Sequence, residues 1–188
     1  MLPTDYPDRY LPLIVALVRD PRWHLLFTDG TQTLFVFDEQ TPTVPGQVSL
    51  GDPNTVRQIA QNLRQRYEKT ALIRDRALQH LGRLLAELQL FPLAEETLAQ
   101  IDTPSAAVLR ARVAYLAGDR LRARQLAEQL IGQSPKIGDG DQVETLCLLA
   151  LNALDFAEPQ QAWQYLAQAL TIDPFHALAL RLLHESKQ

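Results

Sequence analysis

Residues 149–174 read LALNALDFAEPQQAWQYLAQALTIDP. In this stretch small residues stand where two antiparallel helices must approach each other, and large aliphatic residues stand one turn away. A similar pattern of small and aliphatic residues occurs twice upstream. The first copy comprises Leu81-Gly82, Leu85, Ala94 and Leu98. The second comprises Ala111, Ala114, Gly118-Asp119, Ala123, Ala127, Leu130 and Pro135. Internal repetition of this kind is typical of a helical solenoid, an architecture that mostly binds other macromolecules.

The small residues after each turn predict tight helical hairpins. Ala94, Ala123 and Ala162 each begin a second helix, where a larger side chain would push the paired helices beyond close-packing distance. Pro135 and Pro174 each end a unit, because proline stops a helix. We therefore expect Ala123 and Ala162 to be buried at helix–helix contacts.

These residues resemble the tetratricopeptide-repeat family over residues 76–175. The third copy is the best match to that motif, the first lacks its terminal proline, and the second has Arg110 where a large aliphatic is usual. Units two and three lie about 39 residues apart rather than the usual ~34, which fits one insertion at residues 136–142. The resemblance implies a mainly α fold, a short solenoid of helical hairpins that holds a peptide or helix of a protein partner. A helical bundle without repeats is the alternative.

The N-terminal segment reads differently from the repeats. Residues 1–9 are expected to be irregular, and residues 10–19 follow a helical pattern that Asp20-Pro21 ends. Two aromatic and β-branched runs then flank Asp29-Gly30, so Trp23 to Phe27 should pair with Gln32 to Phe37 in a β-hairpin.

Prolines and glycines in residues 38–52 indicate a loop. The sequence thus predicts a helix and hairpin segment at 1–50 and a repeat domain at 51–188. The second segment opens with a helix start at Asp52-Pro53. The apolar pattern after this start fits either two helices, to about Lys69 and over 70–89, or one long helix.

The order of helix, Asp20-Pro21-Arg22-Trp23 and hairpin also resembles the soluble segment that ends many polytopic bacterial glycosyltransferases and related membrane proteins. This second resemblance covers about forty residues and includes no catalytic motif. It implies that the chain is a non-catalytic domain of such a protein, or a partner of one. The alternative is a small cap that packs on the first repeat.

Composition and motifs argue against several classes of protein. The net charge of −4 is unlike that of a general nucleic-acid binder. A single cysteine, Cys147, four scattered histidines and the lack of a glycine-rich phosphate loop predict no metal, no cofactor and no enzymatic activity. No apolar run is long enough to span a bilayer, and the N-terminus is unlike a signal peptide, so we expect no membrane insertion and a cytoplasmic location. The oligomeric state and the partner's identity stay open.

The family's pattern places the first helix of each unit along a groove. The residues expected to bind the partner there are Arg83, Val108, Arg112, Tyr115 and Leu151. Gln79, Glu87, Leu116, Cys147 and Leu154 would face the same groove. An unpaired arginine in a groove would favour an acidic partner.

Three other arrangements compete with the groove. Val108, Leu151 and Leu154 would instead be covered by a C-terminal helix over 175–185. The binding surface would instead be the basic face around Arg64 and Arg74, or the arginines of the second turn, Arg120, Arg122 and Arg124.

Overall fold

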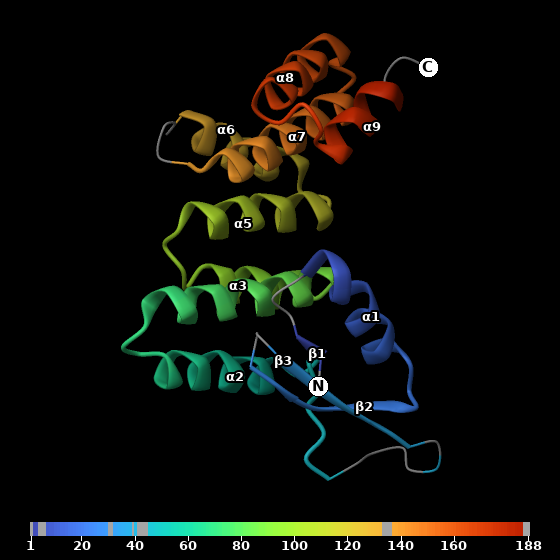
Figure 1. Cartoon of the computed structure of the whole chain (residues 1–188), viewed down its shortest axis with the longest axis vertical. Helices are drawn as coiled ribbons and strands as arrows, with labels where there is room; N and C mark the ends of the chain where they lie inside the picture. Colours follow the sequence, from blue (N-terminus) through green and yellow to red (C-terminus); the bar gives the residue numbers. More distant parts are fainter. Residues whose placement is uncertain are drawn as a thin grey trace. The chain divides into compact units, whose positions relative to one another are not determined.

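The computed structural model describes residues 2–3, 7–29, 32–38, 40, 45–132 and 137–185. The chain is mainly helical and includes one small antiparallel sheet (Figure 1). It divides into two compact units, residues 1–101 and 102–188. Within the described ranges, no helix has the length and apolar character needed to cross a membrane.

The N-terminal unit begins with the sheet and the helix that covers it. Strand β1 (Leu2–Pro3) precedes α1 (Pro7–Arg19), β2 (Trp23–Thr28) and β3 (Gln32–Phe37), and the strand order is β1-β3-β2. The predicted hairpin is confirmed, with β2 antiparallel to β3 and Trp23 opposite Phe37. Its turn residues Gly30 and Thr31 lie outside the described residues.

Helix α1 starts earlier than the sequence led us to expect. The expectation that residues 1–9 are irregular is wrong, because the helix begins at Pro7, and β1 pairs with β3. Proline suits the first helical turn, where its missing N–H would have no partner in the helix. The helix ends at Arg19, directly before Asp20-Pro21, as predicted.

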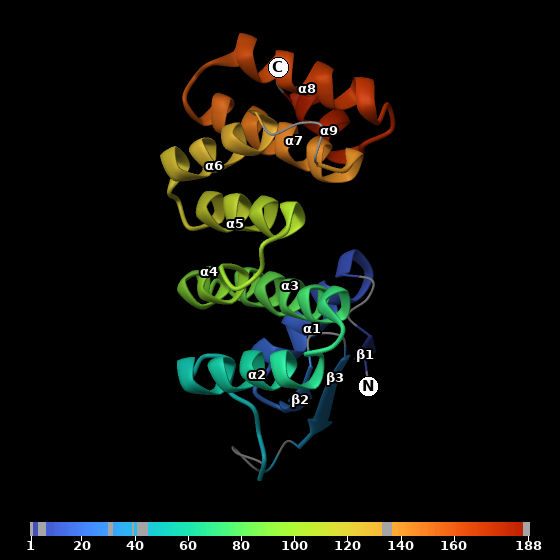
Figure 2. The same cartoon turned by 90° about the vertical axis from the view of Figure 1, so that its left-hand side faces the viewer.

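Three further helices complete this unit: α2 (Pro53–Arg66), α3 (Ala71–Glu87) and α4 (Phe91–Leu98). The Asp52 carboxylate caps α2 by accepting hydrogen bonds from the backbone N–H groups of Asn54 and Thr55. Of the two arrangements left open, the structure has separate helices, since the chain leaves the helix after Arg66 and resumes at Ala71. Helices α2 and α3 lie side by side in both views (Figures 1 and 2).

The division between the two units differs from the one expected at residue 50. Residues before that point are tied to helices after it, because Arg19 donates a hydrogen bond to the backbone carbonyl of Glu87. The Arg66 guanidinium of α2 also lies 3.3 Å from the Asp29 carboxylate, and Leu50 is buried. The helix and hairpin segment is therefore part of a larger unit that includes α2, α3 and α4.

The C-terminal unit consists of two antiparallel hairpins and one final helix. Helices α5 (Pro104–Leu116) and α6 (Arg120–Gly132) form the first hairpin, α7 (Asp139–Asp155) and α8 (Pro159–Ile172) form the second, and α9 (Ala177–Glu185) comes last (Figure 2). Gly118 turns the chain between α5 and α6 with a φ of +88°, a value that glycine adopts without strain. Helix α7 starts inside the stretch expected to be a turn, residues 135–142, and Pro135 lies outside the described residues.

Alanines fill the contacts between these helices. Ala123 and Ala162 are fully buried, which confirms the prediction made for them. The core of the second hairpin also includes residues of the final helix, Ala179 and Leu182, beside Leu166 of α8. Small residues therefore permit the close approach of helices in both hairpins.

Candidate partner-binding surface of the C-terminal unit

Several side chains expected to line the groove are part of the core instead. Val108 is only 3% exposed and packs with Leu130 and Ile137. Leu151 and Leu154 are half-buried and pack against the cluster that includes α9, as the competing arrangement proposed. Val108 belongs to a different cluster, so that arrangement does not apply to it. Little of the Val108 side chain is therefore left for a partner to contact, whereas part of Leu151 stays exposed.

The expected groove arginines lie on two different units. Arg83 is half-buried on α3 of the N-terminal unit, where Gln79 and Glu87 are also half-buried. Arg112 is half-buried on α5 of the C-terminal unit, four residues before the exposed Leu116. Of the five expected residues, Val108, Arg112, Tyr115 and Leu151 therefore belong to one compact unit.

Tyr115 forms a polar cluster with two residues that the sequence did not connect to it. The guanidinium of Arg120 lies 3.7 Å from the centre of the Tyr115 ring, and its Nη1 donates to the Tyr115 carbonyl. The Arg120 Nε also lies 2.6 Å from a carboxylate oxygen of Asp155, at the end of α7. Burial and a hydrogen bond to Asp155 raise the pKa of the Tyr115 phenol, while Arg120 opposes that shift. Tyr115 thus helps to join the turn of the first hairpin to that of the second.

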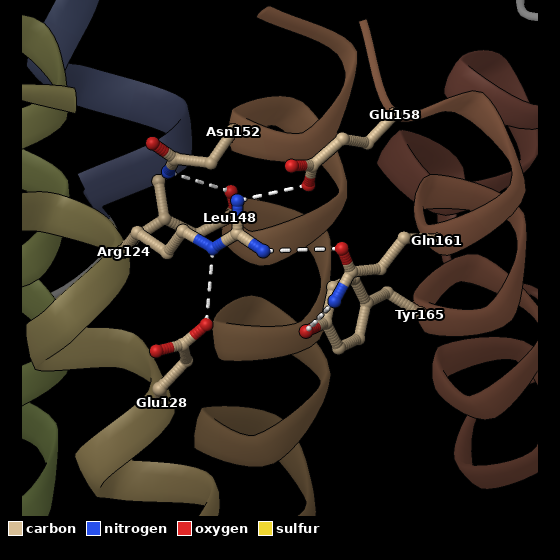
Figure 3. A network of polar contacts seen from close by, with 7 residues as sticks. All are labelled: Arg124, Glu128, Leu148, Asn152, Glu158, Gln161 and Tyr165. Carbon is tan, nitrogen blue, oxygen red and sulfur yellow. Dashed lines mark hydrogen bonds and ion pairs between the residues drawn. The ribbon is translucent and has the colours of Figure 1, made fainter. Parts of the chain in front are cut away.

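A second network joins α6 to the start of α8 (Figure 3). Arg124 donates to Glu128 at 3.0 Å on its own helix, to Glu158 at 2.8 Å and to Gln161 at 3.0 Å. Gln161 in turn donates to the Tyr165 hydroxyl at 3.1 Å. Because the Arg124 side chain is largely buried and makes several charge-assisted bonds, this network holds the two turns in a fixed arrangement.

Exposed apolar residues surround these two fixed turns. Leu116 and Leu121 flank the α5–α6 turn, and Leu121 is 66% exposed. Phe156 comes directly after α7 and lies under the Arg124 guanidinium, 5.8 Å from it. We call Leu116, Leu121, Phe156 and the exposed Arg122 the turn surface. Sequence reasoning identifies the arginines and Leu116 but not Leu121 or Phe156, because a turn gives no sign that its apolar residues lack a covering helix.

The first hairpin is rich in positive charge. Residues 104–132 include five arginines and two acidic residues, namely Arg110, Arg112, Arg120, Arg122 and Arg124 against Asp119 and Glu128. Asp155 and Glu158 of the second hairpin neutralise part of that charge through Arg120 and Arg124. The hairpin's formal charge of +3 falls to +1 when these two carboxylates are counted with it.

A cleft of about 390 Å³ opens at the other end of the second hairpin. Its lining is acidic and includes Asp141, Glu144 and Asp173, with His176 beside them. Asp141 accepts a hydrogen bond of 2.6 Å from Ser105. Within the described ranges, no three histidine, cysteine or acidic side chains are placed to hold a metal ion.

Cys147 lies beneath this cleft and is almost fully buried. Its sulfur is 3.6 Å from Nδ1 of His176. Burial, followed by the charge of Glu144, raises the pKa of the thiol to about 12. A thiol with that pKa is protonated at neutral pH, so it lacks the thiolate that a cysteine nucleophile requires.

Comparison with protein-family models and with curated proteins finds no match to this chain.

Proposed function

We propose that this chain is a non-enzymatic protein-interaction module whose C-terminal unit binds a peptide or helix of a protein partner. The observation that carries this proposal is the turn surface, where exposed leucines and an aromatic ring adjoin arginines held in place by ion pairs. Aromatic and arginine side chains are enriched at the centres of protein interfaces. A fixed arrangement also lowers the entropy lost when a partner binds.

The expected ligand has an apolar stripe and an acidic flank. Its apolar residues would cover Leu116, Leu121 and Phe156, and its carboxylates would face the α5–α6 hairpin, which has more arginines than acidic residues. Attraction between exposed opposite charges weakens with ionic strength. Salt should therefore reduce the affinity without abolishing the apolar part of the contact.

Partner capture and an affinity measurement together test this proposal. The complete chain is used to capture proteins from its source cells, and the Kd of the purified partner is then measured for Leu121→Ser and Leu180→Ser. Leu180 is an exposed leucine on α9, outside the turn surface, and is the matched control. We expect Leu121→Ser to raise Kd by about tenfold and Leu180→Ser to leave it nearly unchanged. Equal affinities for both variants would contradict the turn surface as the site.

The groove expected from the sequence is tested by Arg112→Ala. Arg112 is half-buried on α5, whereas Tyr115→Ala would also remove the ring on which Arg120 rests. A loss of affinity with Arg112→Ala and not with Leu121→Ser would favour the groove of first helices.

A second candidate function is supported by the N-terminal order of elements. Helix α1, Asp20-Pro21 and the β2–β3 hairpin come one after another as in the soluble segment of polytopic membrane proteins that the sequence resembles. In that case the chain would be a non-catalytic domain or partner of such a protein. Capture of a polytopic membrane protein by the complete chain would support this candidate, and capture of soluble partners alone would count against it.

A further inference from the structure

The turn between α2 and α3 exposes aliphatic side chains that the proposed function does not use. Leu72 is 81% exposed and Ile73 is 44% exposed, both in the first turn of α3. Lys69 lies in the turn just before α3, and Arg76 lies on α3 four residues after Leu72, on the same side of the helix. We call Arg64, Lys69, Leu72, Ile73 and Arg76 the basic tip.

The basic tip keeps an excess of positive charge after ion pairing. Residues 64–76 include five cations and two acids. Arg66 pairs with Asp29 at 3.3 Å, and Arg74 pairs with the adjacent Asp75 at 2.9 Å. Within the part of the chain that the structure describes, the other three cations of this segment have no ion-pair partner, and Glu68 is the remaining acid.

The residues of the tip argue against a nucleic acid or a protein as its ligand. A single-stranded nucleic acid would be held by aromatic rings on which bases stack. Tyr67 is the aromatic residue of this segment, and the Arg66 guanidinium lies over its ring, 5.5 Å from the centre. The turn surface proposed for a protein partner includes the aromatic ring of Phe156, whereas the basic tip has two aliphatic side chains and no aromatic one.

Exposed aliphatic side chains in a segment with an excess of lysine and arginine match the chemistry of a lipid surface. Apolar side chains enter the boundary between headgroups and acyl chains, and cations remain at the level of the phosphates. The first turn of α3 adds to this preference, because Thr70 makes no side-chain capping bond to its N–H groups.

We propose that the basic tip docks the N-terminal unit peripherally on a lipid surface that carries anionic headgroups, without spanning it. Leu72 and Ile73 enter the interface, while Arg64, Lys69 and Arg76 contact lipid phosphates. Each cation contributes about fivefold to the binding constant near an anionic surface at moderate salt. Removal of one aliphatic chain from the interface should cost about tenfold.

The test is flotation of the complete chain with vesicles of phosphatidylcholine alone, and with vesicles that also include phosphatidylglycerol. We expect binding to the anionic vesicles only, and lower binding as salt rises. Leu72→Ser, and separately Lys69→Gln with Arg76→Gln, should each weaken binding by about tenfold or more. All three positions are exposed, so the folded state should survive, which an unchanged thermal melt would verify.

A matched pair of substitutions on α9 provides the control. Leu180→Ser with Arg181→Gln removes an exposed leucine and an exposed arginine from the other unit, and it should leave vesicle binding unchanged. The proposal is overturned if the chain binds neutral and anionic vesicles equally, or neither. It is also overturned if the α9 variant loses as much binding as the tip variants, or if polyglutamate or single-stranded RNA binds the tip more tightly than the anionic vesicles.

Discussion

Gly82 marks the closest approach between helices α3 and α4. A Cβ atom at this position would lie 2.6 Å from Cγ of Leu98 and 2.7 Å from its Cδ2, and Leu98 is itself fully buried. Separations below 3.0 Å require atoms to move. The glycine of the first repeat copy is therefore needed for packing, even though glycine weakens a helix.

Gly82→Ala should destabilise the protein by about 1–3 kcal/mol, because overpacking outweighs the better helix propensity of alanine. Gly132→Ala is the control, since Gly132 ends a helix and has open space around its Cβ position. That change should be neutral or stabilise by up to about 1 kcal/mol. Urea unfolding of both variants measures the difference. Equal stabilities would show that the Leu98 side chain can shift to accommodate the added methyl group without loss of stability.

Cys147 should make stability depend on pH in the alkaline range. Its thiol pKa is raised from 9.0 to about 12 in the folded chain. Below pH 9 the thiol is protonated in both states and contributes no pH dependence. Between these two values the unfolded thiol ionises while the folded one stays protonated, so stability falls as pH rises, by at most about 1.4 kcal/mol per pH unit.

The measurement compares the chain with Cys147→Ala by urea unfolding across this pH range. The difference in unfolding free energy between the two proteins should shrink as pH rises, because only the cysteine protein loses stability through this group. A constant difference would mean that the thiol is ionised equally easily in the folded state.

At the scale of the elements, alanine at helix contacts is the feature on which the hairpins depend. Ala162 is fully buried at the start of α8, whereas Ala167 on the same helix is exposed. Ala162→Leu should cost about 1–3 kcal/mol through overpacking. Ala167→Leu should change stability by less than about 0.5 kcal/mol. Thermal melts compare the two, and an equal effect would contradict the role given to Ala162.

Local patterns allowed most of the elements to be predicted. The Asp29-Gly30 dipeptide between two β-rich runs indicated the hairpin, and Asp52-Pro53 indicated the start of α2, because turns and caps depend on a few adjacent residues. The start of α1 at Pro7 was missed, since a polar lead with prolines also fits irregular chain. The helical repeats were expected from small residues whose burial the structure bears out at Ala123 and Ala162.

Contacts between residues far apart in the sequence could not be predicted from these local patterns. Tyr115 was expected to bind a partner, yet its hydroxyl bonds to Asp155, forty residues later. Val108 was expected to face a groove, yet it packs with Leu130 and Ile137. A helical pattern shows that a residue lies on a given side of its helix. Which other element covers that side depends on the tertiary fold.

At the scale of the whole molecule, charge is divided between the two hairpins of the C-terminal unit. The α5–α6 hairpin has five arginines and two acids, whereas the α7–α8 hairpin, residues 139–172, has five acids and no lysine or arginine. An acidic partner should therefore be attracted to the first hairpin and repelled by the second. Its association rate should fall when salt is raised, with a smaller change in the dissociation rate, and stopped-flow mixing at several salt concentrations measures both.

Hydrogen exchange of the complete chain with and without its captured partner tests the central claim most directly. If the turn surface is the binding site, amides around residues 115–122 and 155–158 should gain protection on binding, because the partner covers both turns. Amides of α9, over residues 177–185, should exchange at unchanged rates. Protection confined to the amides of α9, or to amides within α5 and α7 with none at the two turns, would contradict the account.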